Sequence, residues 1–277
     1  MGIEGAASGY RKLEHVDTRE LVAELQSHGI RVLGSTIVGL ENHTPANIDA
    51  AVDYAVAHAT DFHQFMLYTP NPGTPLYEEH RRKGTLLDEA DFSPADAHGQ
   101  YRFNYRHAHI PPGDEEGYLL EAFRRDFAVN GPSLARLIRT LLTGWQRYRH
   151  CPDPRIRDRY RREVAPLRTT YAGAVWAMRR HYRHDAVHRG RMHRLLTDIC
   201  REFGPVTRLL APVIGRWAYR QLKREERRLA AGWRYEPPCF REPNAAMQAL
   251  ESTRPASARK SAPKPVRLTV PAATARS

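Results

Sequence analysis

The stretch His28-Gly-Ile-Arg-Val-Leu-Gly-Ser-Thr-Ile-Val-Gly-Leu-Glu-Asn-His-Thr-Pro45 has the pattern that decides the fold. Gly29 suits the left-handed position that ends a helix. Residues 30–38 are an apolar, β-branched run with little alternation, which predicts a strand covered on both faces. Gly39 breaks this strand, and Thr44-Pro45 places an N-cap oxygen and a first-turn proline in sequence. Helix, strand, turn and helix in this order are typical of a parallel α/β sheet or barrel.

The flanking segments continue the alternation. A short strand is expected over residues 1–4, and Asp17 is a good N-cap for a helix over 18–28. The apolar run 61–68 predicts a further strand, and the remaining expected elements are helices over 45–58 and 75–83. This alternation favours parallel pairing with right-handed crossovers. The predicted fold class is therefore α/β, with about three parallel strands.

Strand patterns disappear beyond about residue 114. An irregular segment over 91–112 precedes a series of expected helices over 114–129, 131–146, 153–184, 187–201 and 205–230. Residues 236–277 are rich in Pro, Ala, Ser and Arg and have few large apolar side chains, which predicts disorder. The expected organisation is an α/β part over 1–110, an Arg-rich helical region over 111–235 and a basic tail over 236–277.

Charge is distributed unevenly over the 277 residues, whose net charge is +12. Residues 1–135 contain 11 Lys and Arg against 20 Asp and Glu, whereas residues 136–235 contain 25 against 8. Such asymmetry indicates regions with different roles. An Arg-rich run is usually a solvated face, and the alternative is a surface for nucleic acid or an anionic membrane. Several aromatic residues interleave with these arginines, among them Trp145, Tyr148, Tyr160, Trp176, Tyr182, Trp217, Tyr219 and Trp233.

The cysteines and the hydropathy exclude several protein classes. Cys151, Cys200 and Cys239 lie far apart, and their odd number argues against a disulfide framework. No apolar run approaches the roughly 18 residues of a membrane span, and the N-terminus does not have the form of a signal peptide. We therefore expect a cytoplasmic protein. The motifs GxxxxGK[ST], GxSxG, HExxH and CxxC are not found.

Several residues at the expected strand ends are candidates for ligand binding. Gly39 permits close approach of a planar ligand, although it also serves simply to turn the chain. Glu4 ends the first strand, where polar residues of parallel folds face the ligand crevice, and the alternative is a solvated acid. His63 lies among apolar residues and is more often a hydrogen-bonded core residue than a ligand. Tyr68 ends its strand and could bond a ligand or lie at the rim.

Histidines gather in the irregular segment. His98, His107 and His109 lie there with Tyr101, Asn104 and Tyr105. Neutral imidazole is a common metal ligand, but the spacing matches no standard metal site. We expect instead a loop that closes over the mouth of the barrel.

Three segments together resemble the consecutive strand ends of radical S-adenosylmethionine enzymes. They are MGIEGAAS, HGIRVLGSTIVGLENHTPANI and DFHQFMLYTPNPGTPLYEE. The resemblance covers roughly residues 1–110 and is to the branch that carries an N-terminal cobalamin-binding domain. It implies that these segments are strands four, five and six of a partial (β/α) barrel that binds S-adenosylmethionine across the strand tips. Full-length relatives use that cofactor for radical methyl transfer or related chemistry.

The resemblance also implies roles for individual residues. Glu4 corresponds to the polar residue that reaches the ribose or amino-acid part of the cofactor. Ile37 corresponds to the apolar residue that packs on adenine, and Gly39 to the turn glycine that follows. Met66, Leu67 and Tyr68 correspond to the backbone that meets the adenine edge. The match at the fifth strand is imperfect, because Ser35 replaces the family's preceding glycine and Asn42 is not its acidic residue.

One departure limits how far the function can be transferred. The CxxxCxxC loop that holds a 4Fe-4S cluster in the family is not in this sequence, and neither are the first three strands or a cobalamin domain. Cys151, Cys200 and Cys239 are too widely spaced to replace three cluster thiolates. We therefore expect this chain to form only a remnant of the barrel. We assign no catalytic residue and no metal ligand to it, and we expect that it is not catalytic alone. The 4Fe-4S cluster and cobalamin are expected only in full-length relatives.

Three hypotheses remain open at this point. The chain could be the C-terminal part of a truncated or split enzyme, whose cluster-bearing half is a separate chain, with a small-molecule substrate that the sequence does not identify. It could be a binding module whose basic helices contact nucleic acid or an anionic membrane. It could also be an inactive fragment.

Overall fold

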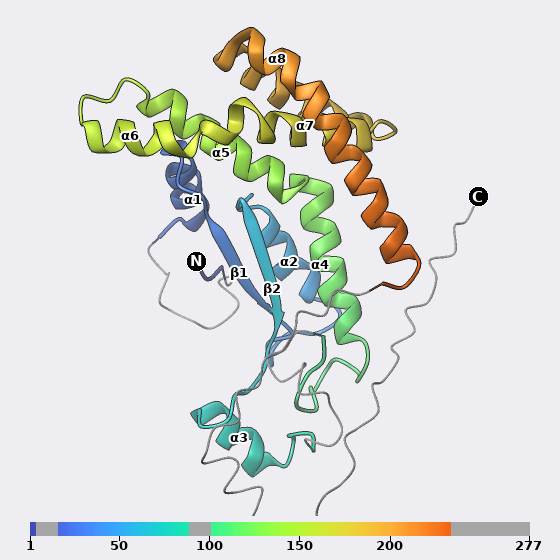
Figure 1. The fold of residues 1–277 in the computed structure, drawn as a ribbon. Coiled ribbons are helices and arrows are strands. Elements are labelled where there is room, and N and C mark those ends of the chain that lie inside the picture. The colour runs from blue at the N-terminus through green and yellow to red at the C-terminus, as the bar shows by residue number, and fades with distance from the viewer. Residues whose placement is uncertain (4–15, 89–100, 234–277) are drawn as a thin grey trace, which may run out of the picture. The chain divides into compact units, whose positions relative to one another are not determined.

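The computed structural model describes residues 1–3, 16–88 and 101–233 (Figure 1). The described residues up to Arg227 belong to one compact unit, Met1–Arg227, and the rest to a second unit, Arg228–Ser277. Glu4, His98, Cys239 and the tail 236–277 lie outside the described residues. The narrower division of the chain at residues 110 and 235 stays a prediction.

The chain begins as alternating helices and strands and continues as helices alone. The first part contains α1 Thr18–Ser27, β1 Leu33–Val38, α2 Ile48–Val56, β2 Phe62–Leu67 and α3 Pro75–Lys83. The second part contains α4 Glu115–Asn130, α5 Ser133–Tyr148, α6 Pro154–Glu163, the short 3-10 helix η4 Ala165–Arg168, α7 Thr170–His181 and α8 Ala186–Ala230. The α/β class and the change to helices after residue 114 are confirmed.

The sheet is parallel. β1 and β2 pair in register from Leu33 opposite Phe62 to Val38 opposite Leu67. The N-terminal residues lie along the other edge of β1 through a parallel bridge between Gly2 and Ser35, where the Ile3 amide donates to the Ser35 carbonyl at 2.8 Å. Within the described part of the chain the sheet has these two strands and the bridge, so a three-stranded partial barrel is not shown.

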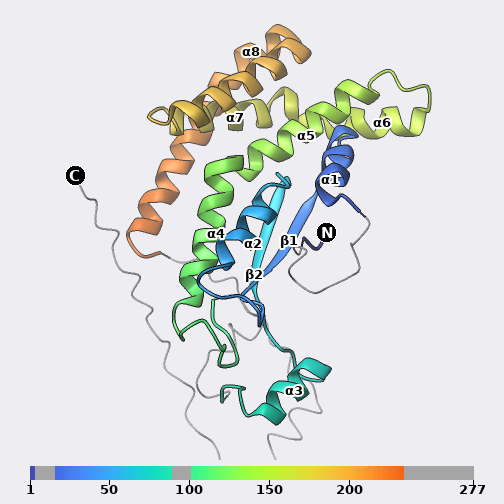
Figure 2. The ribbon, with the colours of Figure 1, turned by 180° about the vertical axis from the view of Figure 1, so that it is seen from behind.

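One face of the sheet is covered. Every second residue is buried, with Thr36 and Val38 of β1 pointing to the same side as Phe65 of β2. The covering helices are α2, which contacts β1, and α4, which contacts β2; the strands pass in front of α2 in Figure 1 and behind it in Figure 2. On the other face Leu33 is 46% and Phe62 50% exposed.

The prediction that residues 30–38 are covered on both faces is therefore wrong for the described residues. The run has little alternation because Leu33 and Ile37 on the second face are also apolar, although no described helix lies over that face.

The local signals for helix ends are largely confirmed. The Asp17 carboxylate accepts from the amides of Arg19 and Glu20 at 2.9 and 3.0 Å, and Gly29 has a φ of 73°. The helix expected from residue 45 begins instead at Ile48. Its start is displaced because the Asn47 side chain accepts from the Thr44 amide at 2.7 Å and holds a separate turn ahead of the helix.

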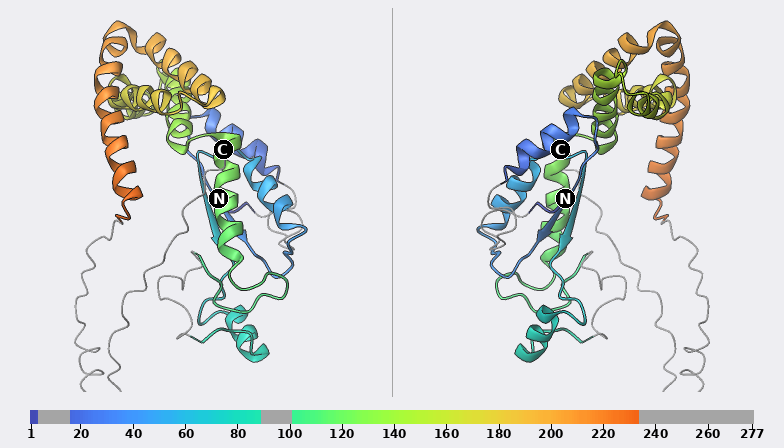
Figure 3. Two further views of the ribbon diagram at one scale, coloured as in Figure 1. Left: turned by 90° about the vertical axis from the view of Figure 1, so that its right-hand side faces the viewer. Right: turned by 90° about the vertical axis from the view of Figure 1, so that its left-hand side faces the viewer.

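The helical part departs from expectation at one place. The single helix expected over 153–184 is divided into α6, η4 and α7. Pro166 lies in the dividing segment, and proline cannot donate the amide hydrogen bond that a continuous helix needs. The expected break between the last two helices falls at Gly204, whose φ of 81° and ψ of −165° are not helical. Figure 3 shows the two limbs of α8 that meet there.

Two apolar clusters stabilise the fold. The first joins the sheet to α2 and α4 and includes Ile3, Val38 and Leu119. The second lies among α5, η4, α7 and α8 and includes Ile138 and Ile199. None of the described helices combines the length and the apolar content that crossing a membrane requires.

Candidate functional site

The carboxyl ends of the two strands lie side by side. Val38 pairs with Leu67, and the Tyr68 amide donates to the Val38 carbonyl at 2.9 Å. The polypeptide leaves the sheet at Gly39 after β1 and at Tyr68 after β2. This is the edge at which parallel α/β folds bind ligands, so the candidate site is built from it.

Gly39 is closed over by an aromatic ring. Its φ is 77°, and a β-carbon at this position would lie 2.4 Å from Cζ of Phe103. Phe103 is itself buried. The neighbouring Tyr105 hydroxyl donates to the Gly39 carbonyl at 3.3 Å. A glycine is therefore required here both by the left-handed backbone and by the ring that covers it.

Two histidines form hydrogen bonds with the backbone of the turn at Gly39 and Leu40. The amides of Gly39 and Leu40 donate to Nδ1 of His43 at 3.1 and 3.2 Å. Nδ1 of His107 accepts from the amides of His109 and Ile110, so Nε2 is the nitrogen that donates to the Leu40 carbonyl, at 3.0 Å. Burial lowers the pKa of His43 below its usual range. Both imidazoles hold the turn through hydrogen bonds to its backbone.

Asn104 leaves one buried acceptor without a partner. Its Nδ2 donates to the Pro70 carbonyl at 2.7 Å, which ties the loop to the end of β2. Its Oδ1 is buried and has no hydrogen-bond partner among the described residues. An unpaired buried acceptor costs stability, so the contact of this loop with the end of β2 is made at the expense of one hydrogen bond.

The uncovered face of the sheet forms a wall that leads to this end. Cross-strand pairs on it are Leu33 with Phe62, Ser35 with Gln64, and Ile37 with Met66. Ile37 and Met66, nearest to the carboxyl ends, are half-buried. The wall is apolar at both ends and polar in the middle, which suits a flat and largely uncharged group better than an ion.

The structure separates the residues expected to contact a cofactor. Ile37 and Met66 lie as a pair on the uncovered face, whereas Leu67 is buried on the covered face. Tyr68 is buried edge-on to Tyr105, with ring centroids 5.8 Å apart. Glu4 lies outside the described residues. The roles of Glu4, Ile37, Gly39, Met66, Leu67 and Tyr68 stay predictions.

His63 is a core residue. It is buried, stacks on Phe65 with centroids 4.2 Å apart, and bonds Thr36 and Thr60 through its two nitrogens at 2.9 and 3.2 Å. Burial lowers its pKa to about 4. The interpretation of His63 as a hydrogen-bonded core residue is confirmed.

The loop 101–110 contributes more to this site than its composition indicated. The histidine and tyrosine cluster predicted a loop that closes over the strand ends, and His107, Asn104 and Tyr105 do contact them. Phe103 was not anticipated, although a large apolar residue in an otherwise polar, irregular segment is a signal that could have identified it. The described residues contain no group of three His, Cys, Asp or Glu side chains arranged to hold a metal ion.

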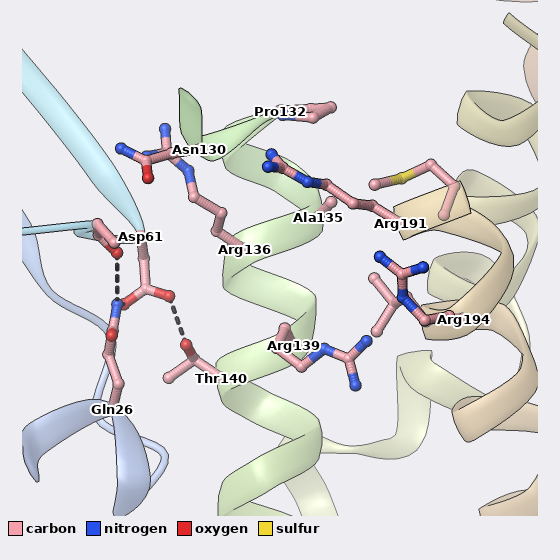
Figure 4. A pocket seen from close by; sticks show the side chains of 13 residues that line it. Gln26, Asp61, Asn130, Pro132, Ala135, Arg136, Arg139, Thr140, Arg191 and Arg194 are labelled. Carbon is pink, nitrogen blue, oxygen red and sulfur yellow. Dashed lines mark hydrogen bonds between the residues drawn. The ribbon is translucent and has the colours of Figure 1, made fainter. Parts of the chain in front are cut away.

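A hollow lies at the opposite, amino end of β2 (Figure 4). It has a volume of about 300 Å³, and four arginines line it: Arg136, Arg139, Arg191 and Arg194. Carboxylates neutralise two of them, since Arg136 pairs with Asp126 and Arg139 with Asp198, each at 2.6 Å. Asp61 also lines it and is hydrogen-bonded to Thr140 and Gln26 (Figure 4). Internal ion pairs therefore account for two of the four arginines of this hollow.

Comparison with known proteins gives one distant similarity. The chain is 31% identical over 80 residues to bacteriochlorophyllide d C-12(1)-methyltransferase of Chlorobaculum tepidum. The matched stretch covers 29% of this chain and 17% of that protein, so the chain spans well under two thirds of the length of the relative. No family model matches the chain, and no solved structure matches it. The similarity to a methyltransferase is partial, and it establishes no family.

Proposed function

We propose that this chain is the C-terminal portion of a radical S-adenosylmethionine enzyme of the cobalamin-binding branch, and that it supplies one wall of the cofactor site. The observation that carries the proposal is the parallel order of the N-terminal bridge, β1 and β2. This order places residues 1–3, β1 and β2 parallel in one sheet, with the carboxyl ends of β1 and β2 at one edge. The partial similarity to a methyltransferase also supports this proposal.

The residues at this end fit the adenosyl part of S-adenosylmethionine. Ile37 and Met66 offer an apolar surface for a flat ring. The neutral state of His43 keeps a positive charge away from the turn, which suits a cofactor that is itself a sulfonium cation.

A 4Fe-4S cluster does not fit the described residues. Cys151, between α5 and α6, and Cys200, in α8, are free thiols, and three thiolates are needed at one site. The proposal therefore assigns the cluster to another part of the assembly, either a further segment of the same protein or a separate chain. The uncovered apolar face, with Leu33 and Phe62 about half exposed, is the surface that this cluster-bearing part would cover.

The test combines this chain with a CxxxCxxC-bearing protein encoded next to it. The two are co-expressed, purified without oxygen, and titrated with radiolabelled S-adenosylmethionine in equilibrium dialysis. We expect co-purification and saturable binding of the cofactor. Ile37→Asp should weaken cofactor binding about tenfold or more, because it places a charge against the ring, while Leu33→Asp should weaken association of the two proteins.

A matched control is Leu120→Asp, which changes an exposed leucine of α4 away from the strands and should alter neither measurement. Circular dichroism confirms that each variant is folded. If Ile37→Asp leaves cofactor binding unchanged, the cofactor site lies elsewhere. Failure of the two proteins to associate would contradict a site shared between two separate chains.

A further inference from the structure

The second limb of α8 carries an exposed apolar stripe. Val206, Leu209, Val213 and Trp217 are 64%, 72%, 61% and 64% exposed. Their spacing of three and four residues puts them on one side of the helix. A row of large apolar side chains that face solvent marks a contact surface rather than a core.

The opposite side of the same limb is packed on α7. Thr207 and Ala211 are fully buried, and a β-carbon at Gly215 would lie 2.6 Å from Cε3 of Trp176. A β-carbon at Gly173 of α7 would lie 2.5 Å from Cγ2 of Ile214. This close crossing fixes the rotation of the helix, so the stripe faces away from the residues that the structure describes.

Positive charge surrounds the stripe. Between Glu202 and Glu225 the sequence contains no Asp or Glu, whereas Arg208, Arg216, Arg220, Lys223 and Arg224 fall in this interval. A groove of about 920 Å³ between α7 and α8 is lined by Trp176, Tyr219 and six arginines, with no carboxylate: Arg179, Arg180, Arg183, Arg189, Arg216 and Arg220. This groove therefore favours an anionic occupant.

The two features together select the kind of occupant. Nucleic acid would neutralise the arginines and stack on aromatic rings, but it has no use for Val206, Leu209 and Val213. A second copy of this chain could cover the apolar stripe but would bring equal positive charge to it. A phospholipid surface offers acyl chains beside phosphates. Helices with an apolar side and an Arg-rich side lie at the boundary between headgroups and acyl chains.

We propose that the second limb of α8 is an amphipathic anchor that lies in the surface of a membrane rich in anionic phospholipid. Val206, Leu209, Val213 and Trp217 enter the boundary of the acyl chains, and Arg216, Arg220 and the neighbouring groove bind headgroup phosphates. This proposal does not depend on the function proposed for the strand ends, since it uses none of the same residues.

The test is flotation of the full chain with vesicles of phosphatidylcholine alone or mixed equally with phosphatidylglycerol. We expect binding to the mixed vesicles that weakens as salt is added, little binding to phosphatidylcholine, and a blue shift of tryptophan emission that is lost in Trp217→Ala. Arg216→Gln/Arg220→Gln should weaken binding about thirtyfold, since each arginine near an anionic surface contributes a factor of about five. Leu209→Ser/Val213→Ser should weaken it about tenfold or more.

Matched controls change similar residues elsewhere. Arg161→Gln/Arg162→Gln alters two exposed arginines of α6, and Leu120→Ser/Val129→Ser alters two exposed apolar residues of α4; both should bind as the unmodified chain does. Circular dichroism shows whether each variant is folded.

Three outcomes would overturn the proposal. One is the lack of binding to the mixed vesicles. Another is tight binding of single-stranded nucleic acid that Leu209→Ser/Val213→Ser leaves intact, which would assign the groove to nucleic acid. The third is a dimer in lipid-free solution that the same double variant dissociates, which would assign the stripe to a second copy.

Discussion

Phe103 covers Gly39 so closely that a β-carbon on the glycine would lie 2.4 Å from Cζ and 2.7 Å from Cε1 of the ring. The two residues are far apart in the chain, one at the end of β1 and one in the loop before α4. Their contact fixes that loop on the carboxyl end of the sheet, where Tyr105 and His107 add hydrogen bonds to the same turn.

Gly39→Ala should destabilise the protein by about 3 kcal/mol, because it combines a left-handed backbone with overpacking against a buried ring. Gly73→Ala is the matched control, since Gly73 also has a positive φ of 81° but has nothing within 4 Å of an added β-carbon. It should cost about 1 kcal/mol. Urea unfolding followed by circular dichroism measures both, and equal losses would show that the Phe103 contact is not rigid.

Asp61 joins β2 to α5 from a fully buried position. Its carboxylate accepts from the Val32 amide at 2.8 Å and from the Thr140 hydroxyl. Asp61→Ala would leave both donors buried and unpaired, so we expect a loss of about 3 kcal/mol in the free energy of unfolding. Asp49→Ala removes an exposed carboxylate from Arg125, which keeps Asp53, and should cost less than about 1 kcal/mol. Similar losses from the two variants in thermal unfolding would contradict this role.

Arg136 and Asp126 form a largely buried ion pair through two hydrogen bonds at 3.0 and 2.6 Å. Arg136→Met should destabilise the protein by about 3–5 kcal/mol, because it leaves the Asp126 charge buried with little compensation. Arg136→Met/Asp126→Leu should recover most of that loss, since no charge then remains. A double-mutant cycle in urea measures the coupling, and strictly additive losses would argue against the pair.

The lowered pKa of His63 predicts that the free energy of unfolding depends on pH. Burial lowers its pKa to about 4 in the folded protein, whereas the pKa of a histidine in the unfolded chain is about 6.5. The unfolded chain therefore binds more protons between these values, and stability should fall by about 3 kcal/mol as the pH drops from 6.5 to 4. Burial also lowers the pKa of His43, His58 and His80 and adds to the same trend.

The measurement is urea unfolding at several pH values for the unmodified chain and for His63→Asn. The variant should be less stable at neutral pH, and its stability should change less between pH 6.5 and 4. His184→Asn, at an exposed position, should leave the slope unchanged. A slope that His63→Asn does not reduce would assign the acid sensitivity to the other buried histidines.

Local signals in the sequence predicted most element positions. Asp17, Gly29 and the run at 61–68 each act within a few residues, and the structure contains the cap, the left-handed turn and the strand that they indicate. The predicted boundaries were wrong where a second local interaction opposed the signal for a helix. Asn47 holds a turn that delays α2, and Pro166 divides a helix that periodicity alone had joined.

The candidate site could be predicted only in part. Apolar residues at 37 and 66 marked the strand ends, but the sequence could not say that they form one cross-strand pair on an uncovered face. Phe103 and the unpaired Asn104 Oδ1 depend on how the loop is laid over the sheet, which no local pattern specifies.

The sequence by itself determined where helices and strands lie, the change from an acidic α/β part to a basic helical part, and the resemblance at the strand ends. These follow from periodicity, caps and composition, which act over short distances. Only the tertiary structure decided which face of the sheet is covered, that Phe103 closes over Gly39, and that the apolar side of the second limb of α8 faces outward. Those outcomes depend on contacts between segments distant in the chain, and burial there is settled by packing rather than by the identity of any single residue.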